Sequence, residues 1–155
     1  MRAFFKKYGS LIVAILIPLA VGALSALLTG DAMRDFAAVE QPPLSPPGFL
    51  FPIVWTVLYI LMGISSFRVW KKQRRASGLT VYAVSLVFNF FWSIFFFVCG
   101  LYLLSLIWLL VLWILVLICT AMFYKIDRPA GLLQIPYCLW CAFALYLNLG
   151  VFLLN

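Results

Sequence analysis

The side chains best suited to bind a ligand are aromatic rings and amides that recur at helical spacing within three apolar segments. Their periodicity places each set on one face of a helix. Trp and Tyr rings pack well against flat apolar molecules, and an amide deep in a membrane needs a partner from another helix or from a ligand. These stripes therefore indicate either a pocket for a flat aromatic molecule or helix–helix packing, and both interpretations stay open. The stripes are Trp55, Tyr59, Met62 and Ser66; Ser85, Asn89, Trp92, Ser93 and Phe96; and Tyr137, Trp140, Ala144 and Asn148.

Metal, acid–base and ion-coupled chemistry are disfavoured by the residue types that the sequence lacks. It contains no histidine, the commonest metal ligand and general base. The apolar segments hold no charged residue in their interiors, and only Arg68 approaches an end. Because proton-coupled transporters usually carry intramembrane charges, a proton-driven pump is not expected. Cys138 and Cys141 have the spacing of a redox or metal pair, but they stand alone in an apolar helix and are interpreted as small packing residues, with no metal site.

The elements that position these stripes are membrane-spanning helices. Of the 155 residues 67% are hydrophobic and 10% charged, with a mean hydropathy of +1.17, whereas soluble domains are roughly 45–50% apolar. Backbone polar groups in lipid must be satisfied within the segment, so apolar runs of roughly 20 residues predict helices. The sequence thus predicts an all-α, single-domain bundle over residues 1–155. Its five transmembrane helices are expected at about 9–29, 50–70, 79–100, 102–124 and 130–154.

Basic clusters between the apolar segments predict the orientation. They precede the first segment, follow the second and follow the fourth, whereas the loop after the first segment is acidic. Cytoplasmic loops are enriched in Lys and Arg, so we expect a cytoplasmic N-terminus and an exterior C-terminus. The net charge of +7 is therefore attributed to topology and not to nucleic-acid binding. The first segment exceeds the 7–15 apolar residues of a signal peptide, and a multi-pass protein of the bacterial inner membrane is expected.

A proline-rich loop at residues 31–49 precedes the second apolar segment. Four of its residues, Pro42, Pro43, Pro46 and Pro47, cannot continue a helix. We therefore expect a rigid lid above a helix that opens with aromatic residues. In the first segment, Gly22 and Ala26 form a small-xxx-small step, a weak signal for helix packing or dimerisation.

Three motifs in order resemble the translocator protein family, also called tryptophan-rich sensory proteins. The first covers the loop and the start of the second segment, Val39–Pro47 and Phe49–Gly63, and the second covers Phe88–Phe96. The family's Trp-Tyr pair corresponds here to Asp35 and Phe36, and its basic residue before proline to Gln41. The third motif is matched at Asp127, Arg128, Leu132, Leu133, Pro136, Tyr137, Trp140, Phe143, Ala144, Leu147 and Asn148.

The resemblance implies a five-helix bundle, often dimeric, with a pocket that opens toward the first loop. Members of the family bind porphyrins and synthetic benzodiazepine- or isoquinoline-type ligands. Some bacterial members are associated with light-dependent breakdown of protoporphyrin, attributed to pocket tryptophans that look like Trp55 and Trp140 here. These two are the candidate catalytic residues if degradation occurs. Sterol recognition is not expected, because no Lys or Arg follows Tyr146 to complete the usual motif.

The sequence thus favours a membrane receptor or sensor for porphyrin-type tetrapyrroles, such as protoporphyrin IX, and for drug-like aromatic molecules. Transport or translocation of tetrapyrroles or other hydrophobic molecules is the alternative. No cofactor is required, and the expected partners are the lipid bilayer, the porphyrin and a second copy of the chain, with no nucleic acid. The predicted ligand-binding residues are Gln41, Pro46, Pro47, Phe49, Trp55, Tyr59, Asn89, Trp92, Tyr137, Trp140, Ala144 and Asn148.

Overall fold

A computed structural model describes residues 2–35 and 38–155, with side chains at 8–32 and 38–155. This part of the chain forms helices and no strand, which confirms the all-α prediction. Five helices are long and apolar enough to cross a membrane, so the chain is a multi-pass integral membrane protein. The helices are α1 (Arg2–Asp35), α2 (Leu50–Lys72), α3 (Ser77–Ser93), the π-helical turn η2 (Ile94–Val98), α4 (Tyr102–Ile126) and α5 (Arg128–Leu154).

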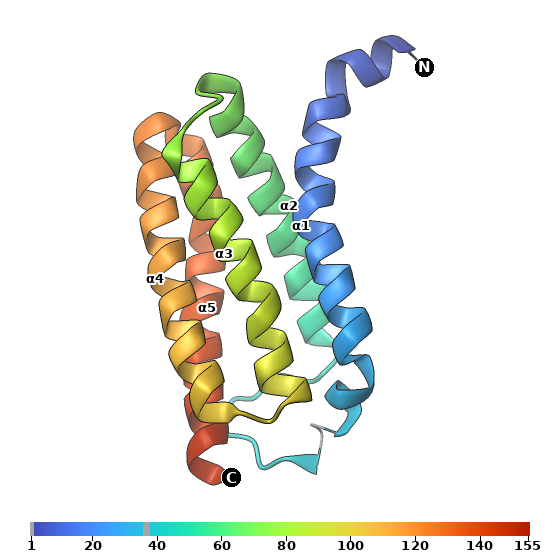
Figure 1. Ribbon diagram of the computed structural model, residues 1–155, viewed down its shortest axis with the longest axis vertical. Coiled ribbons are helices and arrows are strands. Elements are labelled where there is room, and N and C mark those ends of the chain that lie inside the picture. Colours follow the sequence, from blue (N-terminus) through green and yellow to red (C-terminus); the bar gives the residue numbers. More distant parts are fainter. Residues whose placement is uncertain (1, 36–37) are drawn as a thin grey trace.

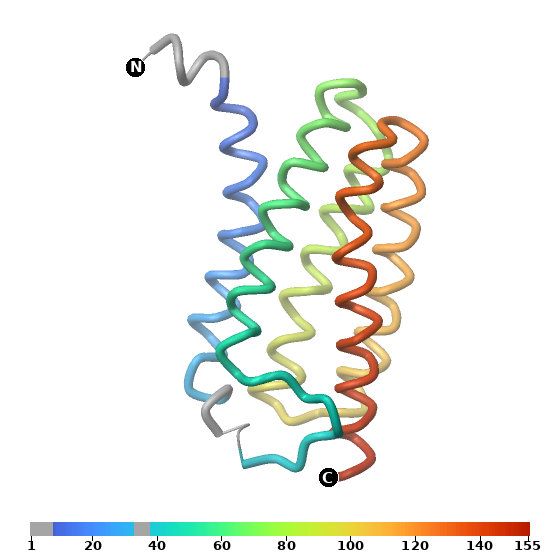
Figure 2. Tube along the Cα trace, turned by 180° about the vertical axis from the view of Figure 1, so that it is seen from behind, coloured from blue at the N-terminus to red at the C-terminus, as the bar shows by residue number. Residues whose placement is uncertain are grey.

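The helices run side by side along the long axis, and α1 lies at one edge of the bundle (Figure 1). The view from behind shows the first loop and the C-terminus at one end and the N-terminus at the other (Figure 2). Within its apolar window α1 has only 11% of its residues buried, against 28–33% for the other four spans. The first helix therefore has the largest share of residues available to lipid or to ligands. Which end faces the cytoplasm stays a prediction from the basic clusters.

Close approach of α1 to α2 depends on a glycine in α2. A Cβ placed on Gly63 would lie 2.5 Å from the Ile15 Cα, closer than real side chains come. A larger residue there would push the two helices apart. Farther along, Pro52 stands in the first turn of α2, where a missing N–H costs no helical hydrogen bond.

The short connection between the third and fourth spans turns at Gly100. This residue has φ of +61°, in the left-handed region that glycine adopts without steric cost. The Leu101 N–H reaches back to the Phe95 carbonyl at 3.0 Å and closes the end of η2. The helical run of α3 and η2 ends just before Gly100, where the sequence predicts a break. The chain reverses direction at this turn, so α3 and α4 lie antiparallel (Figure 1).

Candidate functional site

A cavity of about 580 Å³ lies between α1, α2 and the end of α3, beneath the loop. On α1 its wall is a stripe of small residues, with Gly22, Ala26 and Gly30 four residues apart. The opposite wall is aromatic and comes from α2, α3 and η2. The cavity is lined by Leu19, Gly22, Ala23, Ser25, Ala26, Thr29, Gly30, Gly48, Phe51, Pro52, Trp55, Thr56, Tyr59, Trp92, Ser93 and Phe97.

Trp55 stands at the centre of the aromatic wall. Its ring stacks on Tyr59 with 5.4 Å between centroids and lies 6.4 Å from the ring of Trp92. It also meets Tyr137 and Trp140 edge-on, at 6.1 and 6.5 Å. Such offset and edge-on pairs are the favourable geometries for aromatic rings. Three of the predicted binding residues, Trp55, Tyr59 and Trp92, thus line one cavity.

The amide of Asn89 is held by the protein and does not line the cavity. The Tyr59 Oη donates a 2.8 Å hydrogen bond to Asn89 Oδ1, and Asn89 Nδ2 donates to Tyr137 Oη at 3.1 Å. These bonds join α2, α3 and α5, and the Asn89 and Tyr137 side chains are both 1% exposed. For Asn89 and Tyr137 the geometry favours the packing interpretation of the stripes. Of the three side chains that these hydrogen bonds connect, only Tyr59 also lines the cavity.

Asn148 anchors a second polar cluster nearer the loop. Trp92 Nε1 and Ser105 Oγ both donate to Asn148 Oδ1, at 3.2 and 3.1 Å, and Asn148 Nδ2 donates to the Tyr102 carbonyl at 3.0 Å. A small space of about 30 Å³ beside it is also lined by Gln41 and Ala144. This is room for about one water molecule. Gln41, Ala144 and Asn148 therefore share a small void that borders the large cavity at Phe51, Trp92 and Phe97.

Trp140 lies behind Trp55, away from the cavity. It lines a groove of about 590 Å³ between α2 and α5 that is almost wholly apolar, with Val57, Leu61 and Phe143. Ring contacts join it to Phe51 at 5.9 Å and to Phe143 at 5.6 Å. The two predicted catalytic tryptophans touch each other, but only Trp55 is on the cavity wall.

The loop is fastened to α5 rather than free to swing as a whole. Tyr146 Oη donates to the Pro43 carbonyl at 2.7 Å, and the Asn155 side chain exchanges two hydrogen bonds with the Glu40 backbone at 3.2 and 3.0 Å. Of the predicted lid residues, Pro46 is half-buried, Pro47 is exposed and Phe49 is 66% exposed. Gly48 is the loop residue on the cavity wall. The correspondence of Asp35 and Phe36 to the family's Trp-Tyr pair lies outside the residues with described side chains.

The lining of the cavity carries hydroxyl groups and no charged side chain among the described residues. Thr29 Oγ1 donates to the Ser25 carbonyl at 2.9 Å, and Thr56 Oγ1 donates to the Pro52 carbonyl at 2.7 Å. Each hydroxyl retains lone pairs that can accept a hydrogen bond from a ligand N–H. The cavity is therefore suited to a flat, largely apolar molecule with a few polar atoms.

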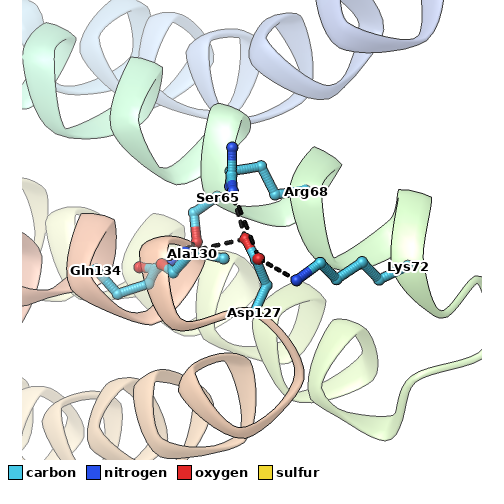
Figure 3. A network of polar contacts seen from close by, with 6 residues as sticks. All are labelled: Ser65, Arg68, Lys72, Asp127, Ala130 and Gln134. Carbon is cyan, nitrogen blue, oxygen red and sulfur yellow. Dashed lines mark hydrogen bonds and ion pairs between the residues drawn. The ribbon is translucent and has the colours of Figure 1, made fainter.

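The salt bridges of the described residues gather around Asp127, at the end of the bundle opposite the loop, and Figure 3 shows this network from close by. Asp127 caps α5 through the Ala130 N–H at 3.2 Å and pairs with Arg68 Nε at 2.6 Å and Lys72 Nζ at 2.5 Å. The hydrogen bond from Arg68, with a further contribution from Lys72, lowers the pKa of the buried Asp127 carboxyl to about 2. Ser65 Oγ donates to the Ala130 carbonyl at 2.8 Å beside this ion pair. The network joins α2 to the start of α5 and does not reach the cavity.

Several lining residues were not among the predicted site residues. The α1 wall could have been inferred from the small-xxx-small step at Gly22 and Ala26, which was interpreted only as a packing signal. Phe51 and Phe97 belong to no stripe that the sequence singles out. Phe97 stands in η2, and π-helical turns recur near functional sites because they change the direction of side chains.

Comparison with known proteins gives the family. The model of the TspO/MBR family matches residues 14–154. The chain is 35% identical over 155 residues to Tryptophan-rich protein TspO of Chlorobaculum tepidum, covering 97% of this chain and 98% of that protein. It is 35% identical to Protein CrtK of Rhodobacter capsulatus (86% and 85% covered) and 31% identical to Translocator protein of Bos taurus (86% and 82% covered). With a match that runs through all five spans, the chain belongs to the TspO/MBR family.

Proposed function

We propose that the protein is a membrane receptor or sensor that binds a porphyrin-type tetrapyrrole in the cavity beneath the loop. The observation that carries the proposal is the pairing of a small-residue wall on α1 with a wall of Trp55, Tyr59 and Trp92. At Gly22 the two walls touch, because α1 packs directly on the Tyr59 ring, so a flat macrocycle would enter beside Ala26 and Gly30, where α1 leaves space and the aromatic wall offers ring faces and edges. The volume of about 580 Å³ lies within the roughly 300–1,000 Å³ of known ligand pockets.

The uncharged lining sets the orientation of the ligand. A carboxylate buried without a partner is strongly disfavoured, so the acidic side groups of a porphyrin would remain at the mouth of the cavity, near water. The ring nitrogens and the apolar edge would enter between the helices, where the hydroxyls of Thr29 and Thr56 can accept hydrogen bonds. A metal-free ring suits this cavity, because its lining residues include no histidine or cysteine.

The names of related proteins point to sensing and to translocation. One relative, 33% identical, is called Tryptophan-rich sensory protein of Cereibacter sphaeroides, and others are called Translocator protein. We place binding first, because the cavity is formed within one chain, and keep transport of hydrophobic molecules as the alternative. We also propose a homodimer in the bacterial inner membrane.

The test of binding is a cavity-filling substitution with a matched control. Protoporphyrin IX should quench tryptophan fluorescence saturably in detergent, in the dark. Ala26→Phe should weaken this binding about tenfold or more, since the added ring occupies the space of the ligand and a loss of about 1.4 kcal/mol is tenfold in affinity. Ala20→Phe adds the same ring to an exposed position of α1 outside the cavity and should bind as the parent does. If both folded variants bind protoporphyrin with equal affinity, the ligand does not bind in this cavity.

Light-dependent breakdown of the bound porphyrin is the second candidate activity, and the contact between Trp55 and Trp140 favours it. The two indoles meet edge-on at 6.5 Å, one on the cavity wall and one behind it. Excited porphyrin and oxygen would supply the reactivity, as cofactors do in other enzymes. In this arrangement Trp55 touches the ligand, whereas Trp140 acts only through Trp55.

A further inference from the structure

A second binding feature lies in the other half of the bundle, outside the proposed porphyrin cavity. A cleft of about 550 Å³ runs between α1, α2 and α3, lined among others by Val13, Ile17, Trp70, Leu79 and Leu86. It shares no lining residue with the cavity beneath the loop. Among the described residues, the only hydroxyl-bearing side chains on its wall are those of Ser10, Ser66 and Tyr82.

This cleft continues along the membrane normal. A second apolar space of about 380 Å³ between α1 and α3 shares Ile17, Ala83 and Leu86 with it. Together they extend along α1 from Ser10 to Leu24, which is about 21 Å at 1.5 Å per helical residue. One leaflet of the hydrocarbon core is about 15 Å thick, half of about 30 Å. The combined groove is therefore longer than the thickness of one leaflet, so an acyl chain could lie in it over its full length.

Positive charge gathers at the end of the bundle where the groove begins. In the described part of the chain this end carries Arg68, Lys71, Lys72, Arg74, Arg75, Lys125 and Arg128 against the single carboxylate of Asp127. Arg68 and Lys72 are paired with that carboxylate. The guanidinium of Arg74 instead lies 5.0 Å from the centre of the Trp70 ring, and Trp70 is on the wall of the cleft. A cation is thus held directly beside the entrance.

We propose that this groove binds an anionic phospholipid, with one acyl chain between α1 and α3 and the phosphate beside Arg74. The apolar groove and the cation at one end match the two halves of such a lipid. Lys and Arg near a membrane surface attract anionic headgroups, and Trp is enriched at the same level. In the sequence the loop at the opposite end carries Asp31, Asp35 and Glu40 against Arg34, so the excess of positive charge lies at the Arg74 end.

A second copy of the chain fits this groove less well than a lipid does. Symmetric dimers in a membrane place equivalent ends together, so two Arg74 clusters would approach each other. Like charges gathered at the membrane surface repel each other, whereas a lipid phosphate neutralises the cation. The charge distribution therefore favours the lipid as the occupant.

Native mass spectrometry of the full chain, titrated with phosphatidylglycerol or phosphatidylcholine, tests the proposal. We expect one phosphatidylglycerol per chain and a preference of about tenfold over phosphatidylcholine, since more than one cation stands near the site. Arg74→Gln should lower the phosphatidylglycerol affinity about fivefold, the effect of one cation near an anionic headgroup. Arg75→Gln removes the same charge from the neighbouring exposed position and should have the smaller effect.

A substitution in the groove separates lipid binding from its alternatives. Ala83→Phe adds a ring at the point that both apolar spaces share and should abolish phosphatidylglycerol retention, whereas Ala121→Phe, at an exposed position of α4 away from the groove, should not. Equal retention of the two lipids, or unchanged retention in folded Ala83→Phe, overturns the proposal. A change in the dimer fraction without a change in lipid retention overturns it too, and assigns the groove to a second copy. Protoporphyrin quenching in Ala83→Phe should match the parent, which keeps this test independent of the porphyrin cavity.

Discussion

The hydroxyl of Tyr59 donates a 2.8 Å hydrogen bond to the Asn89 side chain while the same tyrosine ring lines the large cavity. One residue thus connects the proposed ligand site with the buried polar chain that joins α2, α3 and α5. A ligand packed against Tyr59 would contact a ring whose position is fixed from behind. The wall of the cavity is therefore preorganised, which lowers the entropic cost of binding.

Removal of the Tyr59 hydroxyl should destabilise the fold. Tyr59→Phe leaves the Asn89 Oδ1 without its donor, and an orphaned buried acceptor costs about 1–3 kcal/mol. For a protein of this size a loss of 1 kcal/mol lowers Tm by about 2–4 °C. Thermal unfolding in detergent measures the effect. Tyr82→Phe is the matched control, because the buried Tyr82 hydroxyl forms no hydrogen bond within 3.5 Å among the described residues, so its loss should lower Tm less than the loss of the Tyr59 hydroxyl. Equal losses of Tm in the two variants would show that the hydrogen bond contributes nothing.

Gly22 and Gly30 should respond differently to alanine although both line the cavity. A Cβ on Gly22 would collide with the Tyr59 ring, which cannot retreat because it stacks on Trp55 and is bonded to Asn89. A Cβ on Gly30 meets no atom within 4 Å. Gly30→Ala should therefore raise stability by up to about 1 kcal/mol through helix propensity. Gly22→Ala should lower both Tm and porphyrin affinity, and identical behaviour of the two variants would contradict the close packing of α1 on Tyr59.

The two tryptophans should separate binding from photochemistry. Trp55→Phe should weaken protoporphyrin binding in the dark, because Trp55 lines the cavity, whereas Trp140→Phe should leave it within about twofold, a difference of less than 0.5 kcal/mol. Fluorescence titration of each variant measures this. Under light, the double Phe variant should form no porphyrin breakdown product by absorbance. A parent-like breakdown rate in that variant would rule out a role for both indoles.

The ion pair at the other end predicts a pH dependence. The pKa of Asp127 is lowered in the folded state, to about 2 from an ordinary value of 3.8. Its stabilising contribution is therefore complete above about pH 4 and is lost as the pH falls toward 2. Asp127→Asn should lower Tm at pH 7 and have a smaller effect at pH 2.5. Because the Arg68 and Lys72 side chains are 42% and 55% exposed, added salt should reduce the difference at pH 7. A Tm difference that does not change with pH would show that the cap, and not the charge, dominates.

Hydropathy was sufficient to predict the five helices, although α1 continues to Asp35, which the sequence places in the first loop. Helical spacing also identified the face that turns inward in the second, third and fifth spans. Helical spacing does not reveal whether an inward-facing side chain contacts another helix or lines a cavity, because this depends on how the neighbouring helices are rotated about their axes. Asn89 and Tyr137 satisfy each other across helices, and Trp140 turns toward the outer groove, although both stripes have the same periodicity as the one containing Trp55. The wall on α1 was missed since small residues carry no chemistry of their own.

Protection of a cysteine in the cavity from labelling is the most direct test of whether protoporphyrin binds there. In a Cys99→Ser background, which removes the exposed native thiol, Ala26→Cys and Ala20→Cys each place one accessible thiol on α1. Maleimide labelling in detergent is followed in the dark with and without protoporphyrin IX. We expect protoporphyrin to slow labelling at position 26 and to leave labelling at position 20 unchanged. Unchanged labelling at both positions, at protoporphyrin concentrations that saturate fluorescence quenching, would show that protoporphyrin binds outside the cavity beneath the loop.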